Sequence, residues 1–182
     1  MKPLATDSVC LRTATPEDSE FLLQVYTSTR EDELGMVSWW TEEQKQSFVR
    51  MQFDAQHEHY RKSYPQAEYS VIAAHDRAVG RLYLVELGTE LRILDFTLLP
   101  EHQRQGVGSV LMARLIERAR EKNKTLGIHV ESFRPALRLL ERLGFSKVAE
   151  TGIYFLMQHH PSNREEAGEK EPEIASPTET GG

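Results

Sequence analysis

The stretch LLPEHQRQGVGSVLM, residues 98–112, decides the fold, because it places two glycines between an apolar strand-like run and an amphipathic helix. A tight loop from a strand into a helix exposes unpaired N–H groups at the positive end of the helix dipole, where anions bind readily. Gly106 and Gly108 lack side chains, so backbone can close around phosphate oxygens. Further donors at the rim come from Gln103, Arg104 and Gln105. We interpret the loop as a diphosphate cradle; alternatively, the glycines only make a tight turn.

Two other glycine-rich phosphate loops do not fit this stretch. A Walker loop ends in GK[ST], and GVGSVLM lacks this ending. A dinucleotide fingerprint carries a third glycine, and Leu111 stands in its place.

Apolar periodicity outward from the loop predicts a mixed α/β sheet, with three consecutive strands suggesting an antiparallel meander. The predicted strands are residues 8–12, 68–76, 78–87, 90–99 and 126–130, with one or two more within 144–158. Predicted helices start after Thr15, after Thr41 (to about Lys62), near Val107 (to about Asn123) and at Pro135. Thr41 and Gln44 have the spacing of a capping box.

Helical spacing also predicts which faces point inward. For the first helix these residues are Phe21, Leu22, Val25 and Tyr26. For the second they are Phe48, Met51, Ala55 and Tyr60, and for the third Val107, Val110, Leu111, Leu115 and Ala119.

Length and composition indicate one globular domain, residues 1–160. The chain has 182 residues, 39% hydrophobic and 27% charged, and no apolar run approaches the roughly 18 residues of a membrane helix. The N-terminus lacks the apolar core of a signal peptide and Cys10 is the only cysteine, so we expect a reducing cytoplasm.

The C-terminal segment, residues 161–182, has the composition of a disordered acidic tail. It holds six acids against two bases, which gives −4 of the net −6 and leaves about −2 for the domain. This balance offers no general attraction for nucleic acid, so we expect no nucleic-acid partner.

The loop and a later segment together resemble the GNAT superfamily of acyl-CoA-dependent N-acyltransferases. PEHQRQGVGSVLM is similar to the motif [QR]xxGx[GA], and RPALRLLERLGF, residues 134–145, is similar to NPAxxLYxxxGF. WWTEEQKQSFVRMQF and GRLYLVE also look like a bacterial GNAT subgroup of unknown substrate. The resemblance covers about residues 8–158. It implies a mostly antiparallel sheet with a splayed parallel pair at the cofactor site, flanked by helices.

The resemblance implies that acetyl-CoA is the cosubstrate, and it indicates which residues would bind it. The pyrophosphate would be wrapped by Gln103, Arg104, Gln105, Gly106, Val107, Gly108 and Ser109. Backbone near Leu98 and Leu99 would pair with the pantetheine arm, and an amide near Leu98 would face the thioester oxygen. One such oxyanion donor contributes roughly 3 kcal/mol.

Acetyl transfer to an amine needs a neutral nucleophile, so a base or a water relay must remove a proton. Asp95 interrupts the apolar run RILDFTLL and is one candidate; alternatively, it is a structural carboxylate bound to amides or to an arginine. His129 and Glu131 on the next strand are further candidates. Arg92, where some relatives have a catalytic glutamate, has the wrong charge for a base.

Two positions depart from the family pattern. Leu140 stands where the family has the tyrosine that protonates the departing thiolate, and Arg134 replaces an asparagine. A thiol with a pKa near 8.5 lies about 1.5 units above neutral pH, roughly 2 kcal/mol, so expelling an unprotonated thiolate is tolerable. Tyr154 or a water could substitute; alternatively, Tyr154 is a packed strand residue.

The first two helices and their connection would recognise the acceptor. Aromatic and histidine side chains concentrate there, namely Trp39, Trp40, Phe53, His57, His59, Tyr60 and Tyr64. Most would be core, with Trp39 or Tyr60 as candidates to line an acceptor pocket. His57 and His59 are two residues apart on a helix and make a poor metal pair, so we expect no metal.

The sequence thus predicts an N-acetyltransferase that moves an acetyl group from acetyl-CoA to a primary amine, of a small molecule or a protein, by direct attack in a ternary complex. The alternative is a non-catalytic acyl-CoA-binding regulatory module, suggested by Leu140 and Arg92. A third hypothesis is a toxin-like acetylation of aminoacyl-tRNA. It would require a basic domain, and the charge of about −2 argues against it. We expect no membrane association, and the chain could form a homodimer.

Overall fold

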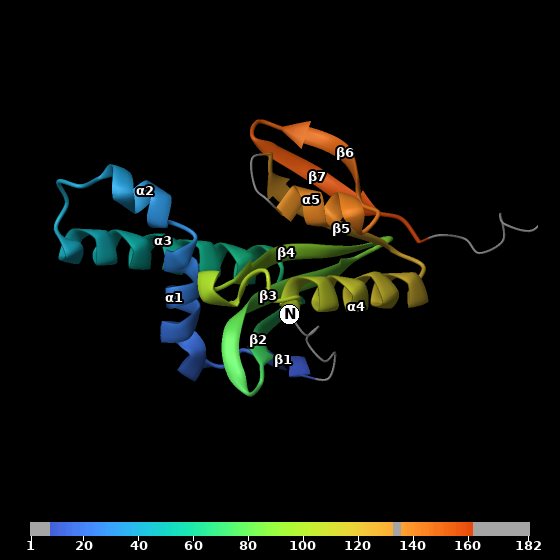
Figure 1. The fold of residues 1–182 in the computed structure, drawn as a ribbon, viewed down its shortest axis with the longest axis horizontal. Coiled ribbons are helices and arrows are strands. Elements are labelled where there is room, and N and C mark those ends of the chain that lie inside the picture. The colour runs from blue at the N-terminus through green and yellow to red at the C-terminus, as the bar shows by residue number, and fades with distance from the viewer. Residues whose placement is uncertain (1–7, 133–135, 162–182) are drawn as a thin grey trace, which may run out of the picture.

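The computed structural model describes residues 8–132 and 136–161, and within them seven strands form one sheet (Figure 1). Its order is β1-β2-β3-β4-β5-β7-β6. The strands are β1 Val9–Thr13, β2 Glu68–Ala74, β3 Arg77–Leu87, β4 Glu90–Leu98, β5 Thr125–Glu131, β6 Ser146–Thr151 and β7 Tyr154–His159. Only β4 and β5 pair in parallel; the other described neighbours are antiparallel. The predicted fold class, including the meander β2–β3–β4, is confirmed.

The described helices connect these strands. They are the 3-10 turns η2 Pro16–Asp18 and η3 Pro100–His102, and the α-helices α1 Ser19–Ser28, α2 Glu31–Met36, α3 Glu42–Ser63, α4 Val107–Glu121 and α5 Ala136–Arg142. The capping box predicted at the start of α3 is present, with Thr41 Oγ1 accepting from the Gln44 amide at 3.2 Å. Helix α2 was not predicted, because six residues carry too little apolar periodicity to reveal a helix.

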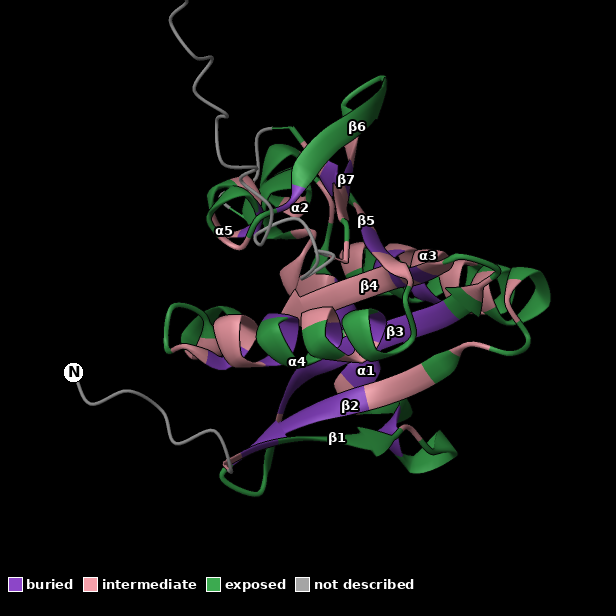
Figure 2. Ribbon diagram, turned by 90° about the vertical axis from the view of Figure 1, so that its right-hand side faces the viewer, coloured by how far each residue is buried: buried purple, intermediate pink, exposed green. Residues whose placement is uncertain are grey.

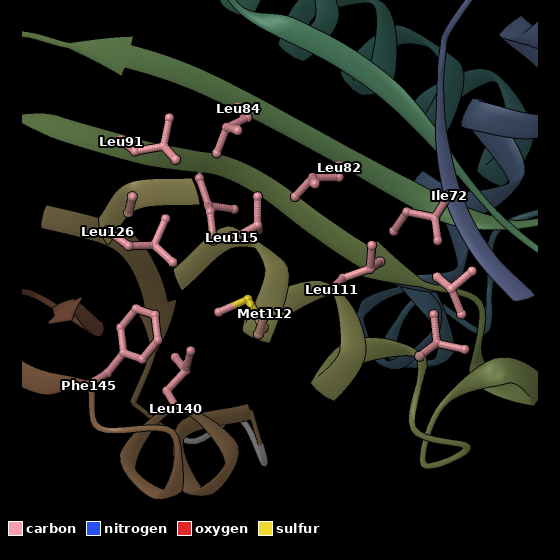
Figure 3. Close-up of a cluster of buried hydrophobic side chains, with 14 of the residues drawn as sticks. Ile72, Leu82, Leu84, Leu91, Leu111, Met112, Leu115, Leu126, Leu140 and Phe145 are labelled. Carbon is pink, nitrogen blue, oxygen red and sulfur yellow. The ribbon is translucent and has the colours of Figure 1, made fainter. Parts of the chain in front are cut away.

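Helices cover both faces of the sheet (Figure 1). On one face α4 and α5 bury the larger core, which Figure 3 shows between α4 and the strands. On the other face α1 and α3 enclose a smaller cluster of Leu22, Tyr26, Val49, Phe53 and Val71. Figure 2 shows the contrast between β3, which is buried along most of its length, and the exposed strand β6.

The predicted inward faces of α1 and α4 are confirmed, with Phe21 and Val110 half-buried at the margins. The prediction for α3 was wrong in part, because Met51 is 59% exposed and Ala55 is also exposed. Val49 and Phe53 point inward instead, where the Phe53 ring meets Tyr26 at 5.8 Å. The packing of α3 on α1 thus fixes a face that its own sequence does not specify.

The two parallel strands separate part-way along. Their pairing runs from Glu90 opposite Thr125 to Ile93 opposite Ile128. A β-bulge follows at Leu94, because Tyr83 pairs with Asp95 while Leu84 pairs with Ile93. Bulges bend the strand that carries them and interrupt its ladder. From there β4 continues beside β3 and β5 beside β7, which is the predicted splay.

Candidate active site

The loop before α4 presents a row of free backbone amides. Gly106 caps the helix with φ 93°, a left-handed conformation that glycine adopts without strain, and Arg104 also has a positive φ of 57°. Val110 is the first residue of the helix whose amide donates to a backbone carbonyl, that of Gly106 at 3.0 Å. Within the described residues, the amides of residues 104–109 donate to no backbone carbonyl. The predicted anion cradle therefore has the donors that it needs.

Two side chains expected at the rim of this cradle also brace the loop. Gln103 Nε2 donates to the Leu98 carbonyl oxygen at 2.8 Å, and Gln105 Nε2 donates to that of Glu101 at 2.5 Å. Each of these side-chain amides uses one of its two N–H groups within the loop, so one N–H of each is left for the predicted contact at the rim. Arg104 is exposed and keeps its position as a cationic rim residue.

Gly108 lies where a side chain would enter the space beside the splayed strands. A Cβ built there would lie 3.9 Å from Leu98 Cδ1 and from Leu139 Cδ2, and 4.0 Å from Phe96 Cζ. These are ordinary van der Waals distances, so a methyl group fits. A larger side chain would fill the space between the loop and β4.

The end of β4 turns one amide toward the opening between the strands. The Leu99 amide donates to the Val79 carbonyl at 2.9 Å. Since backbone groups alternate in direction along an antiparallel strand, the N–H of Leu98 points away from β3, toward the side that β5 has left. The Leu99 N–H is thus taken by β3, and the Leu99 carbonyl accepts from the His102 amide at 2.9 Å, so Leu99 has no N–H left for a pantetheine arm. Of the two predicted contacts, the geometry favours Leu98.

Three predicted catalytic residues lie together on the β5–β7 arm. Leu126 and Val130 are in the core below α4, so the alternate residues His129 and Glu131 lie on the opposite face. Tyr154 pairs with Glu131 in register, and its hydroxyl donates to Glu131 Oε1 at 3.4 Å. Tyr154 is 46% exposed, so its alternative interpretation as a packed strand residue was wrong.

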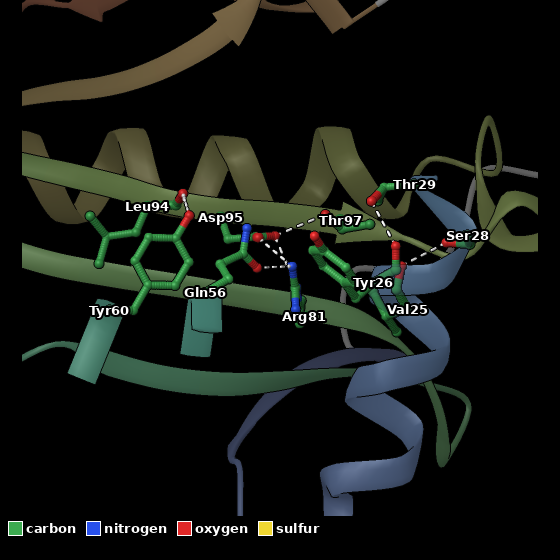
Figure 4. Close-up of polar contacts among 10 residues, drawn as sticks. All are labelled: Val25, Tyr26, Ser28, Thr29, Gln56, Tyr60, Arg81, Leu94, Asp95 and Thr97. Atoms are coloured by element: carbon green, nitrogen blue, oxygen red, sulfur yellow. Dashed lines mark hydrogen bonds and ion pairs between the residues drawn. The ribbon is translucent and has the colours of Figure 1, made fainter. Parts of the chain in front are cut away.

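Asp95 lies on β4, across the opening from the β5–β7 arm, in a buried polar network (Figure 4). Its carboxylate accepts from Arg81 Nη2 at 2.6 Å and Nε at 3.1 Å, and from the Thr97 hydroxyl at 2.8 Å. Burial lowers the pKa of Arg81, but the charge and hydrogen bonds of Asp95, together with the nearby tyrosines Tyr83 and Tyr60, outweigh burial and raise it. These contacts favour the interpretation of Asp95 as a structural carboxylate.

The family comparison decides what this arrangement is. Residues 33–145 match the family described as Acetyltransferase (GNAT) family. The chain belongs to the GNAT family. It is accordingly an acyl-CoA-dependent N-acetyltransferase, and its cosubstrate is acetyl-CoA. The free amides of residues 104–109 and the bare Gly108 fit the phosphates of that cosubstrate.

Solved structures share the GNAT fold at low identity. The PaiA N-acetyltransferase from Thermoplasma acidophilum, in complex with coenzyme A, is 18% identical with a TM-score of 0.64, covering 84% of this chain and 99% of that one. Spermidine N-acetyltransferase from Vibrio cholerae, with coenzyme A and spermine, is 20% identical with a TM-score of 0.59, covering 85% and 96%. The ribosomal-protein-S18-alanine N-acetyltransferase from Escherichia coli is 16% identical with a TM-score of 0.57, covering 87% and 97%. No curated protein matches the chain significantly.

Two residues that differ from the GNAT pattern, Leu140 and Arg92, have defined surroundings in the structure. Leu140 is 3% exposed and belongs to the core near Phe145 (Figure 3), so this position offers packing rather than a proton donor. Arg92 forms an ion pair with Glu90 on the same strand. Arg134 lies outside the described residues, as do residues 162–182 of the predicted tail.

The aromatic residues of the helical region have different surroundings. Trp39 is 75% exposed on the connection between α2 and α3, whereas the hydroxyl of Tyr60 reaches the sheet and donates to the Leu94 carbonyl at 3.1 Å. Burial and the nearby Asp95 charge raise the pKa of Tyr60, so its hydroxyl stays protonated. Sequence reasoning missed this contact, because 34 positions separate the two residues.

A groove of about 700 Å³ lies among α1, α2 and α3. No residue of the cofactor loop lines this groove, so it is distinct from the acetyl-CoA site.

Over the described ranges, no cluster of three or more His, Cys, Asp or Glu could hold a metal ion. In the same ranges, no helix has the length and hydropathy needed to cross a bilayer.

Proposed function

We propose that this enzyme transfers the acetyl group of acetyl-CoA to a primary amine of a small molecule or a protein, by direct attack in a ternary complex. The proposal rests on one observation: two sets of backbone donors suited to acetyl-CoA lie on the same stretch of chain. Free amides at residues 104–109 lead along the loop to the Leu98 amide, which faces the opening between β4 and β5. Structural neighbours named for spermidine and for a ribosomal-protein alanine support an amine acceptor.

The proposed binding mode places each part of acetyl-CoA against backbone. The diphosphate lies on the amides at the start of α4, where the helix dipole adds to its attraction, with Arg104 at the rim. The pantetheine arm extends along β4 past Leu98, whose N–H is left for the thioester. The acyl end then lies in the opening between the strands.

The chemical step requires charge stabilisation and two proton movements. The amine nitrogen attacks the thioester carbonyl carbon, the C–N bond forms and the C–S bond breaks. The Leu98 N–H donates to the carbonyl oxygen as negative charge develops there, an effect of roughly 3 kcal/mol for one such donor. The amine loses a proton and the departing sulfur takes one up.

We assign the proton movements to the β5–β7 arm. Glu131 takes the proton of the amine, directly or through water, with His129 as the second candidate on the same face. Tyr154, whose hydroxyl already donates to Glu131, supplies the proton to the thiolate. Asp95 has a structural role in this proposal, because Arg81 and Thr97 occupy its carboxylate.

Release of the coenzyme A thiol from acetyl-CoA, measured with a panel of amines, tests the proposal. The panel contains spermidine, a peptide with a free α-amine and a peptide with a lysine side chain. Glu131→Gln should lower kcat/KM by about 100-fold or more while coenzyme A binding is kept. Glu43→Gln, an exposed change at the start of α3, should have no effect. Tight coenzyme A binding without turnover on any amine would support the regulatory module instead.

A further inference from the structure

The bulge at Leu94 marks the place where the active site opens. Pairing between β4 and β5 ends at Ile93, one residue before the bulge, and the β3 register shifts at the same point. Four residues further on, Leu98 turns its amide toward the opening. The bulge shifts the β3–β4 register by one residue, and that register is what turns the Leu98 amide away from β3.

Helix α3 reaches the bulge directly through Tyr60 and indirectly through Gln56, one turn earlier on the helix (Figure 4). The Tyr60 hydroxyl donates to the Leu94 carbonyl at 3.1 Å. Gln56 Oε1 accepts from Arg81 Nη2 at 3.0 Å, and Arg81 in turn holds Asp95, the residue after Leu94. Both residues of the bulge are thus tied to the same helix.

The position of Tyr60 is itself fixed by packing. Its ring stands edge-on to Tyr83, with centroids 5.9 Å apart and an interplanar angle of 86°. Tyr83 is fully buried and pairs with Asp95 across the strands. A hydroxyl held by so constrained a ring can fix the carbonyl that it binds.

We infer that Tyr60 is a positioning residue for acetyl transfer. By holding the Leu94 carbonyl, it fixes the bulge at which β4 leaves β5, and so aims the Leu98 amide at the thioester carbonyl oxygen. This role rests on the proposed function, since it assumes that acetyl-CoA lies along β4. Tyr60 acts through the backbone of β4 and has no part in the proton movements.

Tyr69 provides a matched control. Its hydroxyl also donates to a backbone carbonyl, that of Tyr64 at 3.2 Å, and its ring also packs on Tyr83, with centroids 4.9 Å apart. That hydrogen bond lies at the connection between α3 and β2 rather than at the bulge. Tyr69→Phe therefore removes a similar contact without freeing the bulge.

The test is the infrared carbonyl band of bound acetyl-CoA labelled with ¹³C in the acetyl carbonyl. In the wild type, the band should lie at lower wavenumber than in water, because a fixed N–H donor in a site of low dielectric polarises the C=O bond more than solvent hydrogen bonds do. Tyr60→Phe should move it back toward the solution value, and Tyr69→Phe should leave it unchanged. With an amine that supports turnover, Tyr60→Phe should lower kcat about tenfold and change KM for acetyl-CoA less than about twofold.

The outcomes separate this inference from the proposed function. If the wild-type band is shifted and Tyr60→Phe keeps the shift, the role of Tyr60 is overturned while the proposed function stands. If Tyr69→Phe abolishes the shift equally, Tyr60 is only structural and the inference is overturned. If the wild-type band equals that of free acetyl-CoA, the Leu98 contact and the role of Tyr60 are overturned, whereas acetyl transfer itself is decided by turnover with the amine panel. 4-Aminophenylalanine at position 60 supplies an N–H donor in place of the hydroxyl, and should restore the shift even if Tyr60→Phe loosens the fold.

Discussion

Arg81 and Asp95 form an ion pair across β3 and β4, with Arg81 Nη2 2.6 Å from Asp95 Oδ2; Arg81 is buried and the Asp95 side chain is only 10% exposed. The pair lies under α1 and α3, and Asp95 directly follows the bulge at Leu94. A buried charge is tolerated only while its partner compensates it. The same ion pair therefore contributes to the stability of the sheet and holds β4 in place where it separates from β5.

Removing the Asp95 charge should therefore act on folding first. We expect Asp95→Asn to lower the free energy of unfolding by about 3 kcal/mol, because Arg81 remains charged and buried. The double change Arg81→Met with Asp95→Leu should recover much of the loss. Urea unfolding measures both. If Asp95→Asn keeps wild-type stability but loses turnover at all pH values, Asp95 is the general base and the structural interpretation is wrong.

Side-chain size at Gly108 should control cosubstrate binding. Gly108→Ala places a methyl group at ordinary contact distances, so its dissociation constant for coenzyme A should stay within about threefold of the wild type. Gly108→Trp fills the space beside β4 and should abolish binding detectable by calorimetry, although the protein stays folded by circular dichroism. Normal binding by the tryptophan variant would place coenzyme A elsewhere.

The parts of the site that rest on local signals could be predicted from the sequence, whereas those that depend on long-range register could not. The free amides before α4 follow from two glycines and a helix start, which are local signals. The partner of Asp95 is different, since Arg81 reaches it only because the bulge shifts the β3–β4 register. No pattern in the sequence indicates that shift.

Side-chain contacts between distant elements also escaped prediction. Periodicity places Tyr60 on α3 but says nothing of the carbonyl that its hydroxyl meets. Similarly, Gln103 looks like a free donor in the sequence, yet the loop folds back and brings it to the Leu98 carbonyl. The position of a motif is thus easier to predict than the use that the fold makes of its side chains.

The close approach of β3 and β4 at Gly80 should make that position intolerant of any side chain. A Cβ there would lie 2.2 Å from the Thr97 carbonyl oxygen, so the strands would have to move. We expect Gly80→Ala to lower the free energy of unfolding by about 1–3 kcal/mol. Gly35→Ala is the control, because nothing lies within 4 Å of its Cβ and alanine favours the helix. Equal stability of the two variants in urea would contradict so close an approach of the two strands.

Restoring the family tyrosine at position 140 should not restore a proton donor. Leu140 is buried in the core, so Leu140→Tyr overpacks it and should cost about 1–3 kcal/mol in unfolding free energy without raising kcat. Tyr154→Phe should instead slow turnover by about tenfold or more, since it removes the hydroxyl that donates to Glu131. A faster Leu140→Tyr enzyme would show that this side chain reaches the sulfur.

Acid should weaken the fold through Asp18, which accepts from Arg12 Nη1 at 2.7 Å and from the Thr15 amide at 2.9 Å. The hydrogen bonds from Arg12 hold the pKa of Asp18 well below its usual range, although burial of the carboxylate acts in the opposite direction. A lowered pKa in the folded state adds stability above the unfolded value of about 3.9, and this contribution is lost as the pH falls through the folded value.

The matching experiment compares two acidic residues in urea unfolding across pH. At pH 7, Asp18→Asn should lose about 1 kcal/mol, a value limited by solvent screening at the half-exposed Arg12. The difference from the wild type should shrink progressively below about pH 4, because protonation removes the same charge from the wild type. Glu20→Gln breaks an exposed pair with Arg50 and should change stability by less than about 0.5 kcal/mol. A loss for Asp18→Asn that persists unchanged at pH 2 would mean that packing, rather than the charge, stabilises this corner.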